Sequence, residues 1–201
     1  TGKGIGVAVI DSGIAIMPEF GGRIISTRDF TDDRRPGIDL NGHGTHVAGI
    51  IAAAGRTRFD ETQGVAPGAH VISLKVLDAK GKGVVGDVIE AIDWAIANRT
   101  RYNIKVINMS LGGPVTQAWR DDPLCQAVER AYRAGITVVT SAGNFGKAED
   151  GRLIYGGITA PGISPYAITG GALNTKGTPY RSAHEVASHS SQGPTMFRHL
   201  V

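Results

Sequence analysis

The sequence contains a single cysteine and no long apolar run among its 201 residues. One cysteine excludes an internal disulfide and any zinc site built from cysteine ligands. No segment approaches the about 18 consecutive apolar residues of a membrane-spanning helix, and no signal-peptide pattern is present. Cys125 has apolar neighbours in a predicted helix over residues 122–134, so we expect a buried apolar residue there rather than a reactive thiol.

A strong charge of either sign is absent as well. The formal net charge is +3, and the 21 Lys and Arg residues are scattered along the chain. A stripe that binds nucleic acid or a patch that binds a membrane needs clustered basic residues, so neither is expected as a partner. Because internal repeats, linkers and low-complexity segments are also lacking, the chain is expected to form one domain around one core.

Glycine is abundant, with 29 residues and no repeat period, which indicates tight turns and close backbone approaches. The predicted strands cover residues 5–10, 70–77, 105–111, 136–140 and 166–170, and the predicted helices cover residues 45–54, 88–98 and 122–134. Residues 14–41, including a loop at 34–37, and the polar stretch after residue 170 are predicted to be irregular. Strands that alternate with helices in this way indicate an α/β fold of three layers, a mostly parallel sheet with helices on both faces.

The first predicted strand ends in an aspartate. Residues 5–10 are continuously apolar, which is typical of a strand buried on both faces in a parallel sheet. Asp11 therefore falls at the carboxyl end of this strand, where open α/β sheets place their ligand crevices. Taken alone, an aspartate before Ser12 and Gly13 is also an ordinary turn former.

His43 and His46 stand at the head of the small, apolar run 45–54. A helix with small apolar residues on every face is stable only inside a protein, so we expect a buried helix with His43 at its mouth. Two histidines on one helix face suggest a metal site, but a third ligand is not evident and the Glu of an H-E-x-x-H site is absent. The other readings are a structural histidine at a helix start and an imidazole that Asp11 holds for proton transfer.

Asn144 follows the predicted strand 136–140 in a turn that contains Gly143. An amide in such a turn can donate a hydrogen bond to an oxyanion that develops during a reaction. An Asn after a Gly also often serves only to satisfy the turn. Asp11, His43 and Asn144 thus form a candidate constellation in which each member has an ordinary structural explanation.

Four segments resemble, in order and spacing, the motifs of the subtilisin-like serine proteases (subtilases). Residues 7–14 (VAVIDSGI) resemble the aspartate motif, and residues 41–49 (NGHGTHVAG) resemble the histidine motif. Residues 106–113 (VINMSLGG) resemble the substrate-binding strand, and residues 141–144 (SAGN) resemble the motif of the oxyanion asparagine. A late family segment is similar to residues 190–195 (SSQGPT). The resemblance covers essentially the whole chain and implies the subtilisin-like fold.

The resemblance implies a serine endopeptidase that hydrolyses peptide bonds through an acyl-enzyme. In that family the triad is Asp-His-Ser, and the matching positions here are Asp11, which would orient the imidazole, and His43, which would act as general base and acid. Asn144 would donate to the oxyanion. His46 would be a structural residue of the helix.

The resemblance also implies substrate-binding roles, because an extended polypeptide would lie as a strand between two edge segments. The implied edge segments are Lys82 with Gly83, and Ser110 with Leu111 and Gly112; the implied lining of the primary specificity pocket is Ser141, Ala142 and Gly143. The small residues of that pocket imply room for a large apolar side chain. Leu111 and Val85 would form a second apolar pocket.

The family's nucleophilic serine lies in a Gly-Thr-Ser-Met-Ala-type motif that is not among these 201 residues. Ser188, Ser190 and Ser191 precede the point where it would come, and Thr1 lies almost directly before a core strand. We therefore expect residues 1–201 to be a partial catalytic domain, incomplete at both ends. The serine would come from a C-terminal fragment of the same protein, or the chain would be an inactive fragment or pseudoprotease that binds peptides.

The implied reaction requires no cofactor, and no metal site is predicted. Subtilases often bind a structural calcium ion through the loop after the histidine helix. Here that loop carries two arginines and few oxygen ligands, so a solvated loop is the preferred interpretation, with Asp60 and Glu61 as the candidate ligands. The resemblance further implies a secreted protein.

Overall fold

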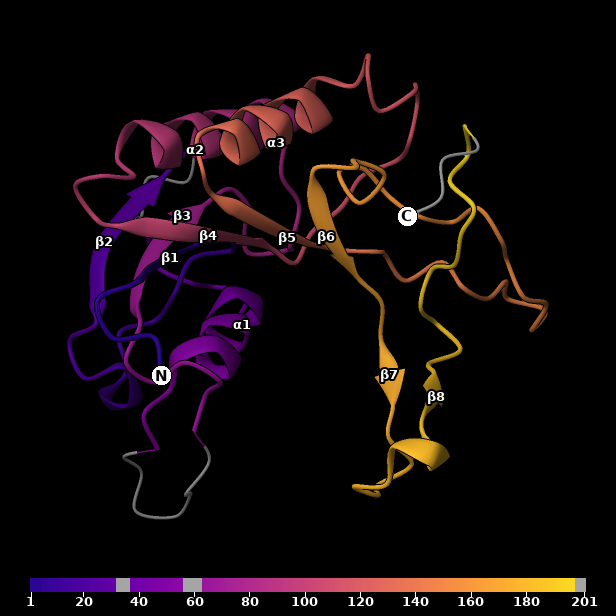
Figure 1. Ribbon diagram of the computed structural model, residues 1–201, viewed down its shortest axis with the longest axis horizontal. Helices are drawn as coiled ribbons and strands as arrows, with labels where there is room; N and C mark the ends of the chain where they lie inside the picture. Colours follow the sequence, from indigo (N-terminus) through magenta and orange to yellow (C-terminus); the bar gives the residue numbers. More distant parts are fainter. Residues whose placement is uncertain (32–36, 56–62, 198–201) are drawn as a thin grey trace. The chain divides into compact units, whose positions relative to one another are not determined.

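The computed structural model describes residues 1–31, 37–55 and 63–197 (Figure 1). Residues 34–36 of the predicted loop and the calcium candidates Asp60 and Glu61 lie outside this part of the chain. The chain forms two compact units. The first comprises Thr1–Ser110 and Arg130–Val138, and the second comprises Leu111–Glu129 and Val139–Val201.

The main sheet has six strands in the order β2-β3-β1-β4-β5-β6, and β1 pairs in parallel with both β3 and β4. The strands are β1 (Gly6–Asp11), β2 (Ile24–Asp29), β3 (His70–Lys75), β4 (Ile104–Met109), β5 (Thr137–Ser141), β6 (Ala167–Gly170), β7 (Leu173–Asn174) and β8 (Glu185–Val186). The helices are α1 (His43–Ala52), α2 (Val85–Ala97) and α3 (Pro123–Arg133), with the short 3-10 helices η1 (Pro18–Phe20) and η2 (Arg181–Ala183). β7 and β8 form a separate antiparallel pair.

Helices cover both faces of the strands in the first unit. In Figure 1, α1 lies on one side of β1 and α2 lies on the other, and both helices contact β1. All six residues of β1 are buried, as a central strand between two helical layers requires. The predicted three-layer α/β fold with a mostly parallel sheet is confirmed.

The prediction that α1 is buried on every face is wrong. Only the stripe of Gly44, Ala48 and Ala52 is buried, because one face of the helix meets the sheet. Ile50 is 55% exposed, and His46 is exposed as well, so the expected packing role of His46 is not supported among the described residues. Both residues line a hollow of ≈ 870 Å³ beside α1. The helix also begins earlier than predicted, at His43 itself.

Two segments predicted to be irregular contain strands. β2 pairs in parallel with β3 at the edge of the sheet, and its residues are half-buried or exposed, so it lacks the apolar run that marks β1. β7 and β8 are two residues long and exposed. Strands of this kind depend on a neighbour for their hydrogen bonds and leave little trace in the hydrophobic pattern.

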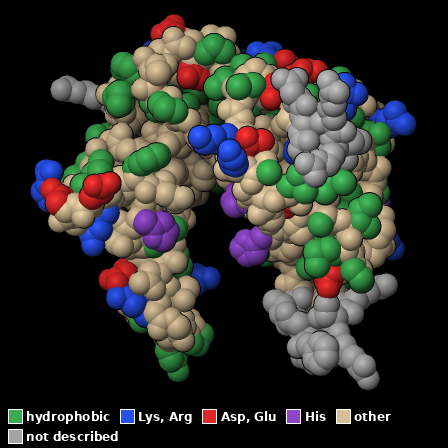
Figure 2. Space-filling view, turned by 180° about the vertical axis from the view of Figure 1, so that it is seen from behind, with side chains coloured by type: hydrophobic (Ala, Val, Ile, Leu, Met, Phe, Trp, Pro, Cys, Tyr) green, Lys and Arg blue, Asp and Glu red, His purple; other side chains and the backbone are tan. Residues whose placement is uncertain are grey.

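Charged and apolar side chains are mixed at the surface. On the face drawn in Figure 2, Lys and Arg side chains are scattered among acidic and apolar ones. Among the described residues, no helix is both long and apolar enough to cross a membrane. The expectations about nucleic-acid and membrane partners stay predictions.

Lys75 is a fully buried lysine at the end of β3. Its Nζ lies 3.6 Å from Oδ2 of Asp29, whose side chain is only 8% exposed, and donates to the carbonyl of Ile38 at 3.3 Å. Burial alone would raise the pKa of Asp29, but hydrogen bonds from Thr31 and Gly37, together with the Lys75 charge, outweigh burial and hold this pKa below its usual value. The Asp29 carboxyl is therefore ionised at neutral pH.

Replacing Lys75 by Met should lower the free energy of unfolding by about 3–5 kcal/mol, because the variant leaves the Asp29 carboxylate buried without its cation. Urea titration measures the change. The matched control is Lys176→Met, which removes the ammonium from the exposed Lys176–Glu185 pair and should cost at most about 1 kcal/mol. Equal losses for the two variants would contradict the buried pairing.

Cys125 is buried with 1% exposure, as predicted, and its backbone N–H donates to the Asp122 carboxylate. Burial and the neighbouring Asp122 charge raise the pKa of the Cys125 thiol well above its ordinary range, so the reactive thiolate is disfavoured.

In the native protein we expect no reaction of the Cys125 thiol with a disulfide reagent such as DTNB at pH 8 on the minute scale. After unfolding in guanidinium, one thiol per chain should react. Prompt labelling before unfolding would show that the thiol is accessible.

Candidate active site

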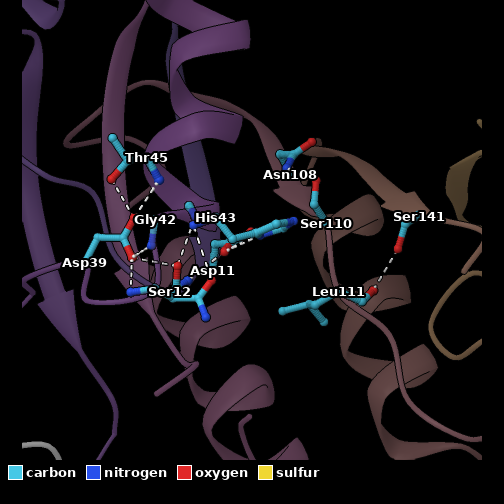
Figure 3. Close-up of polar contacts among 12 residues, drawn as sticks. Asp11, Ser12, Asp39, Gly42, His43, Thr45, Asn108, Ser110, Leu111 and Ser141 are labelled. Carbon is cyan, nitrogen blue, oxygen red and sulfur yellow. Dashed lines mark hydrogen bonds and ion pairs between the residues drawn. The ribbon is translucent and has the colours of Figure 1, made fainter. Parts of the chain in front are cut away.

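Asp11 and His43 meet at the carboxyl end of β1. In the sheet, β1 lies between β3 and β4. Nδ1 of His43 lies 2.8 Å from Oδ1 and 3.0 Å from Oδ2 of the Asp11 carboxylate (Figure 3). The aspartate side chain is 1% exposed, whereas the imidazole is 46% exposed. A buried carboxylate thus holds one ring nitrogen and leaves the ring open to solvent.

The contact between the two residues depends on a glycine. An added Cβ at Gly44 would lie 2.2 Å from the carbonyl oxygen of Gly13 and 3.1 Å from Cβ of Asp11. Only a residue without a side chain lets the first turn of α1 approach the end of β1 so closely. Ser12 joins the same contact, since its hydroxyl accepts a hydrogen bond from the Gly44 N–H at 2.9 Å.

The second unit holds the predicted pocket residues together. Ser141, at the end of β5, donates its hydroxyl to the Leu111 carbonyl at 3.2 Å. Thr159 and Ser191 donate their backbone N–H groups to the carbonyls of Ala142 and Gly143. These contacts fix the backbone of residues 141–143 in place.

Thr159 and Ser191 were not among the predicted site residues. An added Cβ at Gly112 would lie 2.3 Å from Oγ1 of Thr159, and one at Gly143, whose φ is +102°, would lie 2.9 Å from Oγ of Ser191. A side chain at position 112 or 143 would therefore clash with Thr159 or Ser191, so both positions require glycine. The match at residues 190–195 was a signal for Ser191, whereas nothing in the sequence pointed to Thr159.

Asn144 is exposed in the turn that follows β5. Among the described residues, its side-chain amide has no hydrogen-bond partner. Its amide hydrogens are therefore available to an incoming group, as an oxyanion donor requires. The role itself stays a prediction.

The two segments predicted as edge strands are not strands in this structure. β4 ends at Met109, so residues 110–112 follow it, and residues 82–83 belong to no strand. A strand needs a hydrogen-bonded ladder with a neighbour, and no described strand pairs with either segment. Other bonds hold them: Asn108 donates to the Ser110 hydroxyl at 3.0 Å, and the Lys82 N–H donates to the Asp78 carboxylate at 2.9 Å.

The metal interpretation of the two histidines gains no support. His43 is bonded to Asp11, and His46 points to the hollow beside α1. Within the described ranges, no group of at least three His, Cys, Asp or Glu side chains is arranged to hold a metal ion. The absence of a calcium site elsewhere is not tested, because Asp60 and Glu61 lie outside those ranges.

The sequence matches the family Peptidase_S8, described as the subtilase family, over residues 2–200. The chain belongs to the subtilase family. It is 40% identical over 206 residues to "Serine protease AprX" of Bacillus subtilis (strain 168), a match that covers 98% of this chain and 44% of AprX. It is 41% identical over 179 residues to the "Intracellular serine protease" of Paenibacillus polymyxa, covering 86% of this chain and 51% of that protein.

Similar solved structures support the fold. "S41 Psychrophilic Protease" superposes with a TM-score of 0.80 at 35% identity, covering 95% of this chain and 60% of its own. "Sphericase" gives a TM-score of 0.79 at 34% identity, covering 94% and 59%. Both the predicted family and the predicted fold are confirmed, and the chain spans only part of the length of each relative.

Gly44→Ala should disturb the contact between α1 and β1, because the new methyl group would clash with backbone rather than with a flexible side chain. We expect a loss of about 1–3 kcal/mol in the free energy of unfolding, as for overpacking in a core. Gly49→Ala is the matched control in the same helix: nothing lies within 4 Å of its added Cβ, and it should be neutral or stabilising by about 0.5–1 kcal/mol. Urea titration measures the free energy of unfolding of both variants. A tolerated Gly44→Ala would contradict the close approach.

Proposed function

We propose that the intact protein is a subtilisin-like serine endopeptidase and that Asp11, His43 and Asn144 belong to its catalytic site. The observation that carries the proposal is the bond between His43 Nδ1 and the buried Asp11 carboxylate. A carboxylate only accepts hydrogen bonds, so Nδ1 carries a proton, and in the neutral imidazole the lone pair lies on Nε2. The exposed imidazole therefore presents a base to an incoming hydroxyl.

Each residue has a defined role in the proposed mechanism. His43 takes the proton from the nucleophilic serine as the hydroxyl attacks the peptide carbonyl, and gives it to the leaving amine as the C–N bond breaks. It then takes a proton from the water that hydrolyses the acyl-enzyme and returns it to the serine. Asp11 stabilises the imidazolium that forms between these steps. Asn144 donates to the oxyanion of the tetrahedral intermediate, and the reaction needs no cofactor. Since no Gly-Thr-Ser-Met-Ala-type segment occurs in the 201 residues, the serine would come from another part of the protein, such as a C-terminal fragment.

The proposed substrate is an extended polypeptide. Residues 82–83 and 110–112 pair with no described strand, so a substrate strand would pair with backbone groups that are not already bonded. The N–H and carbonyl of Lys82 are bonded to Asp78, and the Leu111 carbonyl accepts from Ser141, which leaves Gly83, Ser110 and Gly112 as the backbone contacts for the substrate. Ser141, Ala142 and Gly143 would line the primary pocket, and their small size suits a large apolar side chain. Leu111 and Val85 would form the second pocket.

The second candidate is a non-catalytic subtilase fragment that binds peptides. This candidate applies to a molecule without the serine motif, because Asp11 and His43 have nothing to activate without a nucleophile. The retained Asp11–His43 contact favours the peptidase, since a protein that only binds peptides has no chemical need for a poised base.

A serine-directed fluorophosphonate separates the two candidates. We expect it to label the intact gene product, which should also cleave a fluorogenic peptide, and to leave a preparation of the 201-residue chain unlabelled. Intact mass spectrometry identifies which polypeptide carries the label. An intact protein that takes up no label and cleaves no peptide, yet binds peptides, would replace the peptidase by the binding fragment.

In the intact protein, His43→Ala should lower kcat by about 10⁶-fold, a magnitude carried over from subtilisin itself rather than deduced from these contacts. His46→Ala is the control on the same helix and should keep most of its turnover per folded molecule. Initial rates on a fluorogenic peptide, with melting temperatures recorded for both variants, measure the difference. Equal losses of turnover in His43→Ala and His46→Ala, at unchanged melting temperatures, would contradict the assignment of His43 as the base.

Cellular location and calcium remain predictions of the family resemblance. Export is one proposal, but a relative from Paenibacillus polymyxa carries the name "Intracellular serine protease", so family membership does not decide location. A structural calcium ion would lie outside the proposed chemistry, and its candidate ligands Asp60 and Glu61 lie outside the described residues.

A further inference from the structure

The first turn of α1, which carries His43, is held by side chains from outside the helix. The N-cap residue is Gly42 at φ +93°, which has no side chain to cap the turn. The N–H of His43 donates to Asn41, that of Gly44 to the Ser12 hydroxyl, and that of Thr45 to the Asp39 carboxylate. These are the donors that every helix start leaves without an internal partner.

Asp39 accepts five hydrogen bonds with one carboxylate. Oδ1 accepts from Ser12 Oγ at 2.9 Å and from the N–H groups of Asn41 and Gly42 at 3.0 and 2.8 Å. Oδ2 accepts from the N–H and the hydroxyl of Thr45, at 2.9 and 2.5 Å. Figure 3 shows these bonds converging on one side chain. A negative charge at this place also suits the positive end of the helix.

Burial by itself would raise the pKa of Asp39, but the hydrogen bonds from Thr45, Gly42 and Ser12 outweigh burial and hold this pKa below its usual value. The bonds are therefore complete at neutral pH. Because the folded pKa is lowered, they are lost only as the pH falls below about 4.

The same carboxylate is connected to the loop that carries Asp11. Ser12 bonds Asp39 through its hydroxyl and Asp11 through its N–H, at 2.9 and 2.7 Å. The Thr45 hydroxyl, bonded to Asp39, also accepts from the N–H of Ala15 at 2.9 Å. Asp39 thus joins the two segments whose side chains meet in the Asp11–His43 contact.

The Lys75–Asp29 pair, at the ends of β3 and β2, holds the backbone that precedes Asp39. Lys75 donates to the carbonyl of Ile38, the residue before Asp39, and Asp29 accepts from the N–H of Gly37 at 3.1 Å. The backbone that leads into Asp39 is therefore fixed to the sheet, as a residue that positions others must be.

We propose that Asp39 is a positioning residue for His43: through Ser12 and the first turn of α1, it sets the imidazole against Asp11. The proposal deepens the peptidase function and rests on it for the role of His43. A residue that merely caps a helix would affect stability alone. A positioning residue affects the rate of the chemical step, because small displacements of a base slow proton transfer.

The test uses Asp39→Asn in the intact protein. The amide keeps the size of the carboxylate but loses its charge and one acceptor oxygen. We expect kcat to fall by about 10- to 100-fold, with KM changed by less than about threefold. In NMR spectra, we expect a downfield signal for the Nδ1 proton of His43 because Asp11 accepts it, and this signal should shift or broaden in the variant. The matched control is Asp150→Asn. Like Asp39, Asp150 accepts hydrogen bonds through both carboxylate oxygens, but its two bonds come from Arg152 and lie outside the predicted site.

Asp39→Asn with kcat within twofold of the wild type and an unchanged His43 proton signal would overturn the proposal. So would an equal effect of Asp150→Asn. If the wild-type protein shows no peptidase activity and takes up no serine-directed label, the proposed function fails, but the NMR comparison still decides whether Asp39 positions His43. The two failures are therefore distinguishable.

If Asp39→Asn does not fold, Ser12→Ala tests whether Asp39 positions His43. This variant cuts the hydroxyl link between Asp39 and Gly44 and leaves the Ser12 backbone bond to Asp11 in place. We expect a smaller loss of kcat in the same direction and a shifted His43 proton signal. Where both variants fold, the double variant should lose less than the product of the two single losses, because both act through one network. A Ser12→Ala protein with unchanged kcat and signal would overturn the proposal.

Discussion

The structure depends on the close approach of a helix start to the end of the central strand. β1 is buried on both faces, and α1 touches its carboxyl end through Gly44, where no side chain fits. This approach brings the His43 imidazole to the Asp11 carboxylate and leaves helix donors near the strand end that must be satisfied. Ser12 and Asp39 satisfy them, so the packing constraint and the geometry of the site are one arrangement.

A buried charge supports the same arrangement from within the sheet. Lys75 lies between β1 and β2 in the register of the strands, opposite Asp11 on one side and Asp29 on the other. Its ammonium is fully buried and contacts the Asp29 carboxylate and the carbonyl that precedes Asp39. A buried charge pair contributes little net stability over a well-packed apolar pair, but here the Lys75 ammonium also bonds the Ile38 carbonyl, a contact that an apolar side chain does not make.

The fold was largely predictable from the sequence, because its central elements carry strong patterns. The apolar run before Asp11 predicted a strand buried on both faces, and the apolar neighbours of Cys125 predicted its burial. The edge strand β2 and the short pair β7–β8 escaped prediction, since half-buried or exposed strands have no such run. The burial of α1 was overestimated because small apolar residues show how a helix is able to pack, not which of its faces a partner covers.

The sequence by itself determined the family, the order of the elements and the identity of Asp11, His43 and Asn144 as candidates, since these follow from residue types at fixed spacings. Only the tertiary structure decided that Nδ1 of His43 faces Asp11, that Gly44 is required by a backbone contact, and that Thr159 and Ser191 bond the carbonyls of Ala142 and Gly143. It also gave Asp39 a place in the site. The physical reason is that a hydrogen bond or a close contact joins groups far apart in the chain, and hydrophobic periodicity carries no information about which groups those are.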